Sequence, residues 1–197
     1  MRKVIAADIA VSLSENRFTM GLLAIYLAMG MFTAFFRIFS VLFAVTLVMN
    51  VMAYNERSGF ERFMAAMPVK RSAIVAARYV EMVGLSAMLI IAQYLLSNIL
   101  PGIARQSAGE IVVLLGTLLV YVSVIMPFIT KLGVERSRVV YIVVLAACAA
   151  VAAVVGVEGG APESTVGFLG IILPAAGLAG CAVSVPLSLS FYNKREF

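Results

Sequence analysis

The stretch FTMGLLAIYLAMGMFTAFFRIFSVLFAVTLVMNVMA, residues 18–53, contains a single charged side chain, Arg37. A helix needs about 20 apolar residues to cross the roughly 30 Å hydrocarbon core of a membrane, so this run is long enough for two crossings. Backbone groups in lipid must be hydrogen-bonded internally, and the run lacks the alternation of a barrel strand. The sequence therefore predicts two membrane helices, over residues 18–36 and 38–54, joined by a tight turn near residues 35–40.

The rest of the chain has the same apolar character. Hydrophobic residues make up 63% of the 197 positions and charged residues 13%, whereas a soluble domain is about 45–50% apolar and about 25% charged. We expect an all-α, polytopic membrane protein with six transmembrane helices in a single domain over residues 1–197, preceded by a short interfacial helix over residues 1–14. The four remaining spans are predicted over residues 74–100, 110–130, 139–157 and 166–191.

The basic residues are distributed unevenly about the predicted spans. Of the 15 Lys and Arg residues, only Arg37 and Arg105 fall on one side of the predicted membrane, and all the others fall on the opposite side. Lys and Arg accumulate in cytoplasmic loops, so we expect a multi-pass protein of the inner (cytoplasmic) membrane with both termini in the cytoplasm. The isoelectric point of the chain, about 9.5, therefore reflects its topology in the membrane. No soluble basic surface is available for nucleic acid. The other basic residues are Arg2, Lys3, Arg17, Arg57, Arg62, Lys70, Arg71, Arg78, Lys131, Arg136, Arg138, Lys194 and Arg195.

The composition removes several kinds of chemistry. The chain has no histidine, its only aspartate is Asp8, and it contains no G-x-x-x-x-G-K-[ST] loop. A histidine metal site, a paired-aspartate protease, a Ser-His pair and a nucleotide site of its own are therefore excluded. No ionisable group lies deep in a span, since Glu81 falls about two turns inside the third, and this disfavours transport driven by protons or sodium. We expect no enzyme activity and no cofactor in this chain.

The segment between the second and third spans carries an unusual share of the charge. Ser58 and Glu61 form a Ser-x-x-Glu capping box that starts a helix over residues 58–67, which Pro68 ends. The residues alone allow two interpretations: this amphipathic helix lies on the lipid surface, or it docks into a cytoplasmic partner. Its apolar face is formed by Phe60, Phe63, Met64 and Met67.

Three segments resemble one family of membrane proteins. The first, ERSGFERFMAAMPVKRSAIVAARYVE at residues 56–81, is similar to the signature of small permeases of bacterial ATP-binding cassette exporters of the type-2 (ABC-2) class. The second is FITKLGVERSRVVYI at residues 128–142, and the third is SLSFYNKREF at residues 188–197. The matching positions are Glu56, Ser58, Phe60, Glu61, Met67, Pro68, Arg71, Ile74, Val75, Arg78 and Tyr79; Lys131, Gly133, Glu135, Arg136 and Arg138; and Ser188, Tyr192, Lys194, Arg195 and Glu196.

The resemblance implies a permease subunit without an ATPase site, whose helix 58–67 is the coupling helix that docks on a separate ABC ATPase. Two ATPase copies would bind ATP and Mg, and two permease copies would form a homodimer. The implied cargo of this exporter is a peptide or a hydrophobic compound. The implied coupling residues are Ser58, Phe60, Glu61, Arg62, Phe63 and Met67. A secondary cytoplasmic contact is expected at Lys131, Glu135, Arg136 and Arg138.

We expect the substrate path at the dimer seam, lined by the first, second and fifth spans, where methionines offer adaptable apolar contacts. Its candidate residues are Met29, Met31, Met49, Asn50 and Met52. Other classes of protein stay open. The substrate-binding membrane subunit of an energy-coupling vitamin importer has a similar length and number of spans. A structural or assembly membrane protein is a further alternative, and a membrane enzyme is the least favoured.

Overall fold

The computed structural model describes residues 17–30, 34–59, 71–99, 106–157 and 163–194, and all regular structure in these ranges is α-helical. The all-α prediction is therefore confirmed for this part of the chain. The predicted interfacial helix over residues 1–14 and most of the predicted coupling helix lie outside the described residues. The helices are α2 (Arg17–Gly30), α3 (Ala34–Arg57), α5 (Arg71–Ile99), α6 (Ala108–Leu132), α7 (Val134–Val157) and α8 (Glu163–Lys194).

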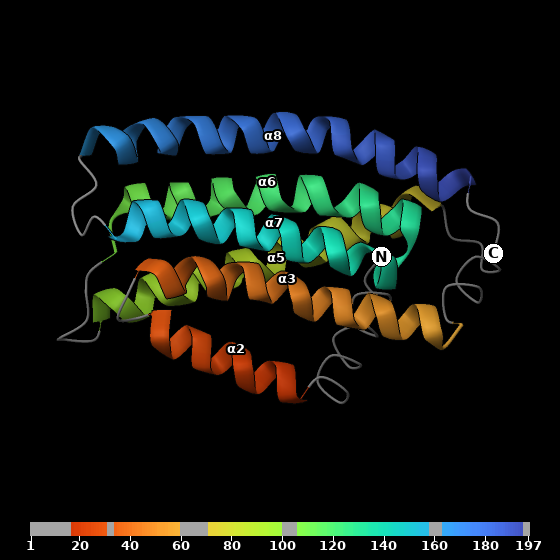
Figure 1. Ribbon diagram of the computed structural model, residues 1–197, viewed down its shortest axis with the longest axis horizontal. Helices are drawn as coiled ribbons and strands as arrows, with labels where there is room; N and C mark the ends of the chain where they lie inside the picture. The colour runs from red at the N-terminus through yellow and green to blue at the C-terminus, as the bar shows by residue number, and fades with distance from the viewer. Residues whose placement is uncertain (1–16, 31–33, 60–70, 100–105, 158–162, 195–197) are drawn as a thin grey trace.

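The helices run alternately up and down in one bundle (Figure 1). One end of the bundle holds the last turns of α3, α6 and α8 together with the first turns of α5 and α7. We call it the basic end, and its described basic residues are Arg57, Arg71, Lys131, Arg136, Arg138 and Lys194. Arg37 and Glu110 lie at the other end, which we call the opposite end. The uneven distribution of charge in the sequence thus corresponds to the two ends of the bundle.

Helix α3 lies at the centre of the bundle. In the most apolar stretch of α3, 67% of the residues are buried inside the protein, against 11% in the most apolar stretch of α8. Residues such as Leu42, Val45 and Met49 on α3 pack with Met82 of α5 and Leu118 of α6 in one hydrophobic core. Helix α3 is therefore enclosed by its neighbours α2, α5, α6 and α7, whereas α8 packs on the outside of the bundle.

Within the described residues, four helices are long and apolar enough to cross a membrane: α3, α5, α6 and α8. Helix α2 has 14 residues, which gives a length of about 21 Å. It is shorter than a usual span. The membrane-protein prediction agrees with these four helices, and the number of six spans stays a prediction.

The expected turn at residues 35–40 is wrong in its position, because these residues are helical and belong to the first turns of α3. The reason is that Arg37 is held inside the protein, with 5% of its side chain exposed. Its Nε donates to the carbonyl of Gly30, the last residue of α2, at 2.9 Å. Its Nη1 lies 2.6 Å from Oε2 of Glu110 in the first turn of α6. The charge that we took as the mark of a loop instead joins three helices.

Helix α8 packs on α6 through glycines. A Cβ at Gly116 would lie 2.6 Å from the backbone nitrogen of Pro174, and one at Gly177 would lie 2.5 Å from Cβ of Leu119. A Cβ at Gly180 would lie 2.6 Å from Oγ of Ser123. Small residues let two helix backbones approach closely in a membrane, where no hydrophobic effect drives helices together. We call this contact the α6–α8 seam.

Polar groups between the helices are mostly paired with one another. Thr46 and Tyr141 share a hydrogen bond between α3 and α7, and Gln93 of α5 donates to the hydroxyl of Ser40 on α3 at 2.5 Å. Asn98 instead bonds to a carbonyl of its own helix. These contacts agree with the packing role that intramembrane amides and hydroxyls usually have.

Candidate functional site

The three sequence segments that resemble one family meet at the basic end. The first includes the end of α3 and the start of α5, the second is the turn between α6 and α7, and the third is the end of α8. Figure 1 shows these helix termini gathered at one end of the bundle. Segments that are far apart in the sequence thus form one surface, which surrounds the ends of the connection between α3 and α5.

The end of α3 is fastened to the start of α7. Oε2 of Glu56 accepts a hydrogen bond from the backbone N–H of Val134 at 2.9 Å. The guanidinium of Arg57 donates to Oε1 of Glu135 through Nε at 2.9 Å and through Nη2 at 2.5 Å. We call these four residues the α3–α7 clamp. It joins two consecutive residues of one helix to two consecutive residues of another.

The backbone at both sides of the clamp depends on glycine. Helix α3 ends at Arg57, and Gly59 has a φ of 71°. Helix α6 ends at Leu132 and α7 begins at Val134, so that Gly133, with a φ of 83°, is the one residue between them. Residues with a side chain rarely adopt these values, whereas glycine adopts them at little cost. The N–H of Gly133 also caps α6 by donating to the carbonyl of Ile129 at 2.9 Å.

The ion pair of the clamp sets the charge state of Glu135. Its hydrogen bond to Arg57, and then the positive charge of that residue, hold the pKa of the Glu135 carboxyl below its usual range. A carboxyl with a lowered pKa contributes to stability above its unfolded pKa, and the contribution is lost as the pH falls through the folded pKa. Glu135 therefore stays ionised at neutral pH, and its attraction to Arg57 is lost only under acidic conditions.

The start of α5 is fastened to the end of α8. Arg71 donates through Nη1 to the backbone carbonyl of Asn193 at 2.9 Å. Nearby, Nζ of Lys131 lies 5.2 Å from the centre of the Phe191 ring, which is a cation–π distance. Both helices that flank the connection between α3 and α5 are thus tied to another helix at the basic end.

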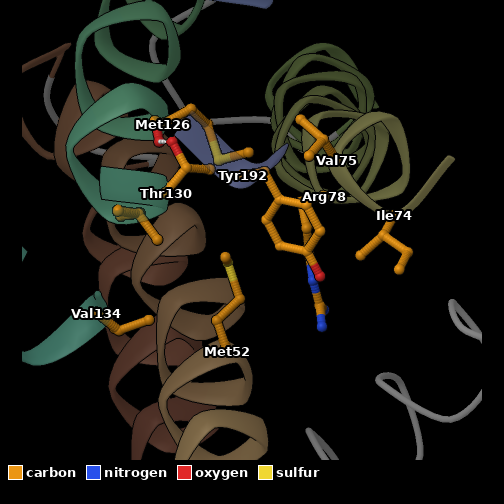
Figure 2. A pocket seen from close by; sticks show the side chains of 9 residues that line it. Met52, Ile74, Val75, Arg78, Met126, Thr130, Val134 and Tyr192 are labelled. Atoms are coloured by element: carbon orange, nitrogen blue, oxygen red, sulfur yellow. Dashed lines mark hydrogen bonds between the residues drawn. The ribbon is translucent and has the colours of Figure 1, made fainter. Parts of the chain in front are cut away.

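A small cavity lies beneath these contacts, where α3, α5, α6, α7 and α8 converge (Figure 2). Its volume of about 20 Å³ has room for about one water molecule. Arg78 and Tyr192 line it and extend in the same direction in Figure 2, and both side chains are buried. The other lining residues are Met52, Ile74, Val75, Met126, Ile129, Thr130 and Val134.

The family-like positions on α5 beyond Arg71 face this interior. Arg78 pairs with Glu81 one turn further along, with 3.1 Å between Nη1 and Oε2, and both side chains are buried. The hydroxyl of Tyr79 forms hydrogen bonds with those of Ser184 at 2.6 Å and Ser188 at 3.0 Å on α8. Tyr79 thus holds α5 against α8, whereas the Arg78–Glu81 pair lies within α5. All three side chains are covered by the bundle.

The predicted coupling residues are only partly described. Ser58 follows the last residue of α3, and its hydroxyl donates to the carbonyl of Asn55 at 3.3 Å. The predicted capping box and the roles of the other coupling residues stay predictions. Phe60, Glu61, Arg62, Phe63 and Met67 lie outside the described residues.

The residues of the predicted secondary contact lie at the basic end, and their contact with a partner stays a prediction. Lys131 lies in the last turn of α6 and contacts Phe191, and Glu135 belongs to the α3–α7 clamp. Arg136 and Arg138 are exposed on the first turns of α7. The structure thus brings this group beside the end of α3, from which the predicted coupling helix would start.

The candidate path residues are not gathered at one place. Met29 is exposed near the end of α2, whereas Met49 and Met52 are buried in the core of the bundle. Gly30 contacts Arg37, and Met49 lies 12 residues beyond Arg37 on α3, a rise of about 18 Å. Asn50 is half-buried on the same helix, and Met31 lies outside the described residues. These positions therefore stay a prediction about an assembly of two copies.

Sequence reasoning gave no role to Glu56, although it belongs to the first family-like segment. The sequence around Glu56 did not indicate a specific contact, because a carboxylate at the end of an apolar helix usually marks only the membrane surface. In the part of the chain that the structure describes, no three His, Cys, Asp or Glu side chains gather as metal ligands.

Comparison with protein families gave one decisive match. Residues 13–193 match the family described as ABC-2 family transporter protein. The chain belongs to the ABC-2 transporter family. The match covers α2 to α8 and almost all of the three resembling segments. Searches of curated proteins and of solved structures returned no match.

Membership of the ABC-2 family identifies a multi-pass membrane component of a transporter. Proteins of this family are transport components and act with an ABC ATPase partner. The helices of this ABC-2 protein that can cross a membrane agree with that role.

Proposed function

We propose that the chain is the permease subunit of an ABC exporter, and that the segment over residues 58–67 couples it to a separate ATPase subunit. Two permease copies and two ATPase copies form the transporter, and the cargo is a peptide or a hydrophobic compound. The observation that carries the proposal is the arrangement around this segment. The helix before it is fastened to α7, and the helix after it is fastened to α8.

The arrangement supports a mechanical role for a simple reason. An ATPase that binds the segment can move the permease only through contacts that stay rigid under load. An amphipathic segment that rested on lipid would need no such fastening of its two ends. The family match supports the same choice over the vitamin-importer alternative.

The proposal is tested by removing the aromatic face of the segment. Aromatic side chains in a partner pocket commonly contribute about 2 kcal/mol or more each to binding. We expect the Phe60→Ala, Phe63→Ala double variant to insert into the membrane normally. Its affinity for the ATPase that purifies with the wild-type protein should fall by at least about tenfold, and ATP hydrolysis by the reconstituted complex should fall with it.

The matched control is Phe168→Ala on α8. Phe168 is 65% exposed near the start of α8, at the opposite end of the bundle, so its loss should change neither binding nor hydrolysis. If the double variant binds the ATPase as tightly as the wild type does, the segment lies on lipid and the coupling role is rejected.

A further inference from the structure

The two halves of the α3–α7 clamp differ in strength. The side chains of Arg57 and Glu135 are 66% and 60% exposed, and exposed ion pairs contribute little because water and salt screen them. Glu56 instead bonds to an N–H in the first turn of α7, at a residue that is 3% exposed. A carboxylate is favoured at a helix N-terminus by the helix dipole, and its hydrogen bonds to backbone N–H groups are charge-assisted. Glu56 is thus the half that fixes the position of α7.

Glu56 lies at the point where a movement of the proposed coupling segment would enter α3. Glu56 lies on the last turn of α3, two residues before Ser58, where the proposed coupling segment starts. A displacement of that segment therefore reaches Glu56 before it reaches the buried middle of α3. From Glu56 the contact leads to α7, which runs back to the opposite end of the bundle (Figure 1). Thr46 and Tyr141 join the same two helices further along.

We propose that Glu56 is a positioning residue that makes the end of α3 and the start of α7 move as one unit. A displacement of the segment after α3 by the ATPase is then passed to α7 through the Glu56–Val134 hydrogen bond. The inference rests on the proposed function, which assigns that segment to the ATPase contact.

The hydrogen bond can be removed from either side. Glu56→Ala removes the acceptor, and Glu56→Gln keeps an acceptor oxygen but loses the charge. Val134→Pro removes the donor, and proline is tolerated at the first position of a helix, where its missing N–H disturbs no intrahelical bond. Val134→Ala is the companion variant, because it trims the side chain and keeps the N–H.

The measurement is hydrogen–deuterium exchange of the full-length permease with its co-purifying ATPase in lipid nanodiscs. Exchange is compared between the nucleotide-free complex and the complex trapped with ATP and vanadate. In the wild type and in Val134→Ala, trapping should change exchange both at residues 54–59 and at residues 136–145. In Glu56→Ala and Val134→Pro, the change at residues 54–59 should remain and the change at residues 136–145 should be lost. Glu56→Gln should retain part of it.

The Glu56→Ala, Val134→Pro double variant should behave like either of its single variants, because both substitutions remove the same hydrogen bond. A purely structural role would raise exchange in α7 without nucleotide, yet would leave the nucleotide-dependent difference unchanged. That difference is therefore the deciding readout. If Val134→Pro does not fold, Glu56→Ala and Glu56→Gln decide the matter together.

An unchanged α7 response in Glu56→Ala overturns the inference. So does a wild-type complex that responds at residues 54–59 and not in α7. Both outcomes leave the proposed function standing, since the ATPase still binds and hydrolyses ATP. A wild-type permease that binds no ATPase is a different result, which overturns the proposed function and this inference with it.

Discussion

At the residue scale, two arginines with similar contacts differ in their surroundings. Arg37 and Arg57 each pair with a glutamate, but the side chain of Arg37 is 5% exposed and that of Arg57 is 66% exposed. Removing one partner of a buried ion pair costs about 3–5 kcal/mol, whereas an exposed pair contributes about 0–1 kcal/mol. The same substitution should therefore have different effects at the two ends of the bundle.

We expect Arg37→Ala to lower the free energy of unfolding by about 3 kcal/mol. It leaves the carboxylate of Glu110 and the carbonyl of Gly30 without the guanidinium that binds both. The value is at the low end of the range because Glu110 is partly exposed and can regain water. Arg57→Ala, the matched control, should change the free energy by less than about 1 kcal/mol. Chemical unfolding in detergent measures both variants, and equal losses would contradict the burial of Arg37 within the helix bundle.

At the element scale, the α6–α8 seam makes the glycines of α8 unequal. A Cβ at Gly177 would meet Leu119 at 2.5 Å, whereas one at Gly170, two turns earlier on the same helix, would meet nothing within 4 Å. Overpacking costs about 1–3 kcal/mol, and replacing a helical glycine by alanine in open space gains up to about 1 kcal/mol. The two substitutions are chemically identical and should act in opposite directions.

We therefore expect Gly177→Ala to lower the thermal unfolding temperature and Gly170→Ala to leave it unchanged or raise it. Gly116→Ala should resemble Gly177→Ala, because its Cβ would approach the backbone of Pro174. Thermal unfolding of the purified protein in detergent gives all three temperatures. A seam that tolerates alanine at both Gly116 and Gly177 would contradict the close approach of α6 and α8.

The sequence was sufficient to predict helices of this kind, because long apolar runs without alternation leave no other way to satisfy the backbone in lipid. It was not sufficient to place the break between α2 and α3. A charge inside an apolar run usually marks a loop, but Arg37 is satisfied by Gly30 and Glu110. Glu110 is 73 positions away in the sequence, and no local pattern indicates that contact. The choice of the α8 glycines that face α6 likewise depends on a contact between distant segments that no local pattern indicates.

At the scale of the whole molecule, the charge asymmetry predicts which end faces the cytoplasm. Ala108 is exposed at the opposite end and Ser72 is exposed at the basic end. In a chain whose Cys148 and Cys181 are replaced by alanine, we expect Ala108→Cys to react with a membrane-impermeant maleimide on intact cells. Ser72→Cys should react only after the cells are permeabilised. Labelling of Ser72→Cys from outside would reverse the topology and remove the basic end from reach of a cytoplasmic ATPase.

The same asymmetry explains how much of the candidate site could be predicted. The charges of the three family-like segments place them on one side of the membrane, where loops can meet. The contact of Glu56 with the N–H of Val134 could not be predicted in this way. It depends on the register of α3 against the one-residue turn at Gly133, which only the packed bundle determines. The cavity lined by Arg78 and Tyr192 depends in the same way on five helices at once.

The α6–α8 seam also has a consequence for biogenesis. Helix α8 is the last of these helices to be synthesised, and it packs mainly on α6, which is already in the membrane when α8 leaves the ribosome. The glycine face of α6 therefore stays without its α8 partner while the intervening α7 is inserted. A substitution in the seam therefore delays the final step of assembly, at a stage when the other helices have met. Membrane proteases that recognise an undocked helix would find it in α8.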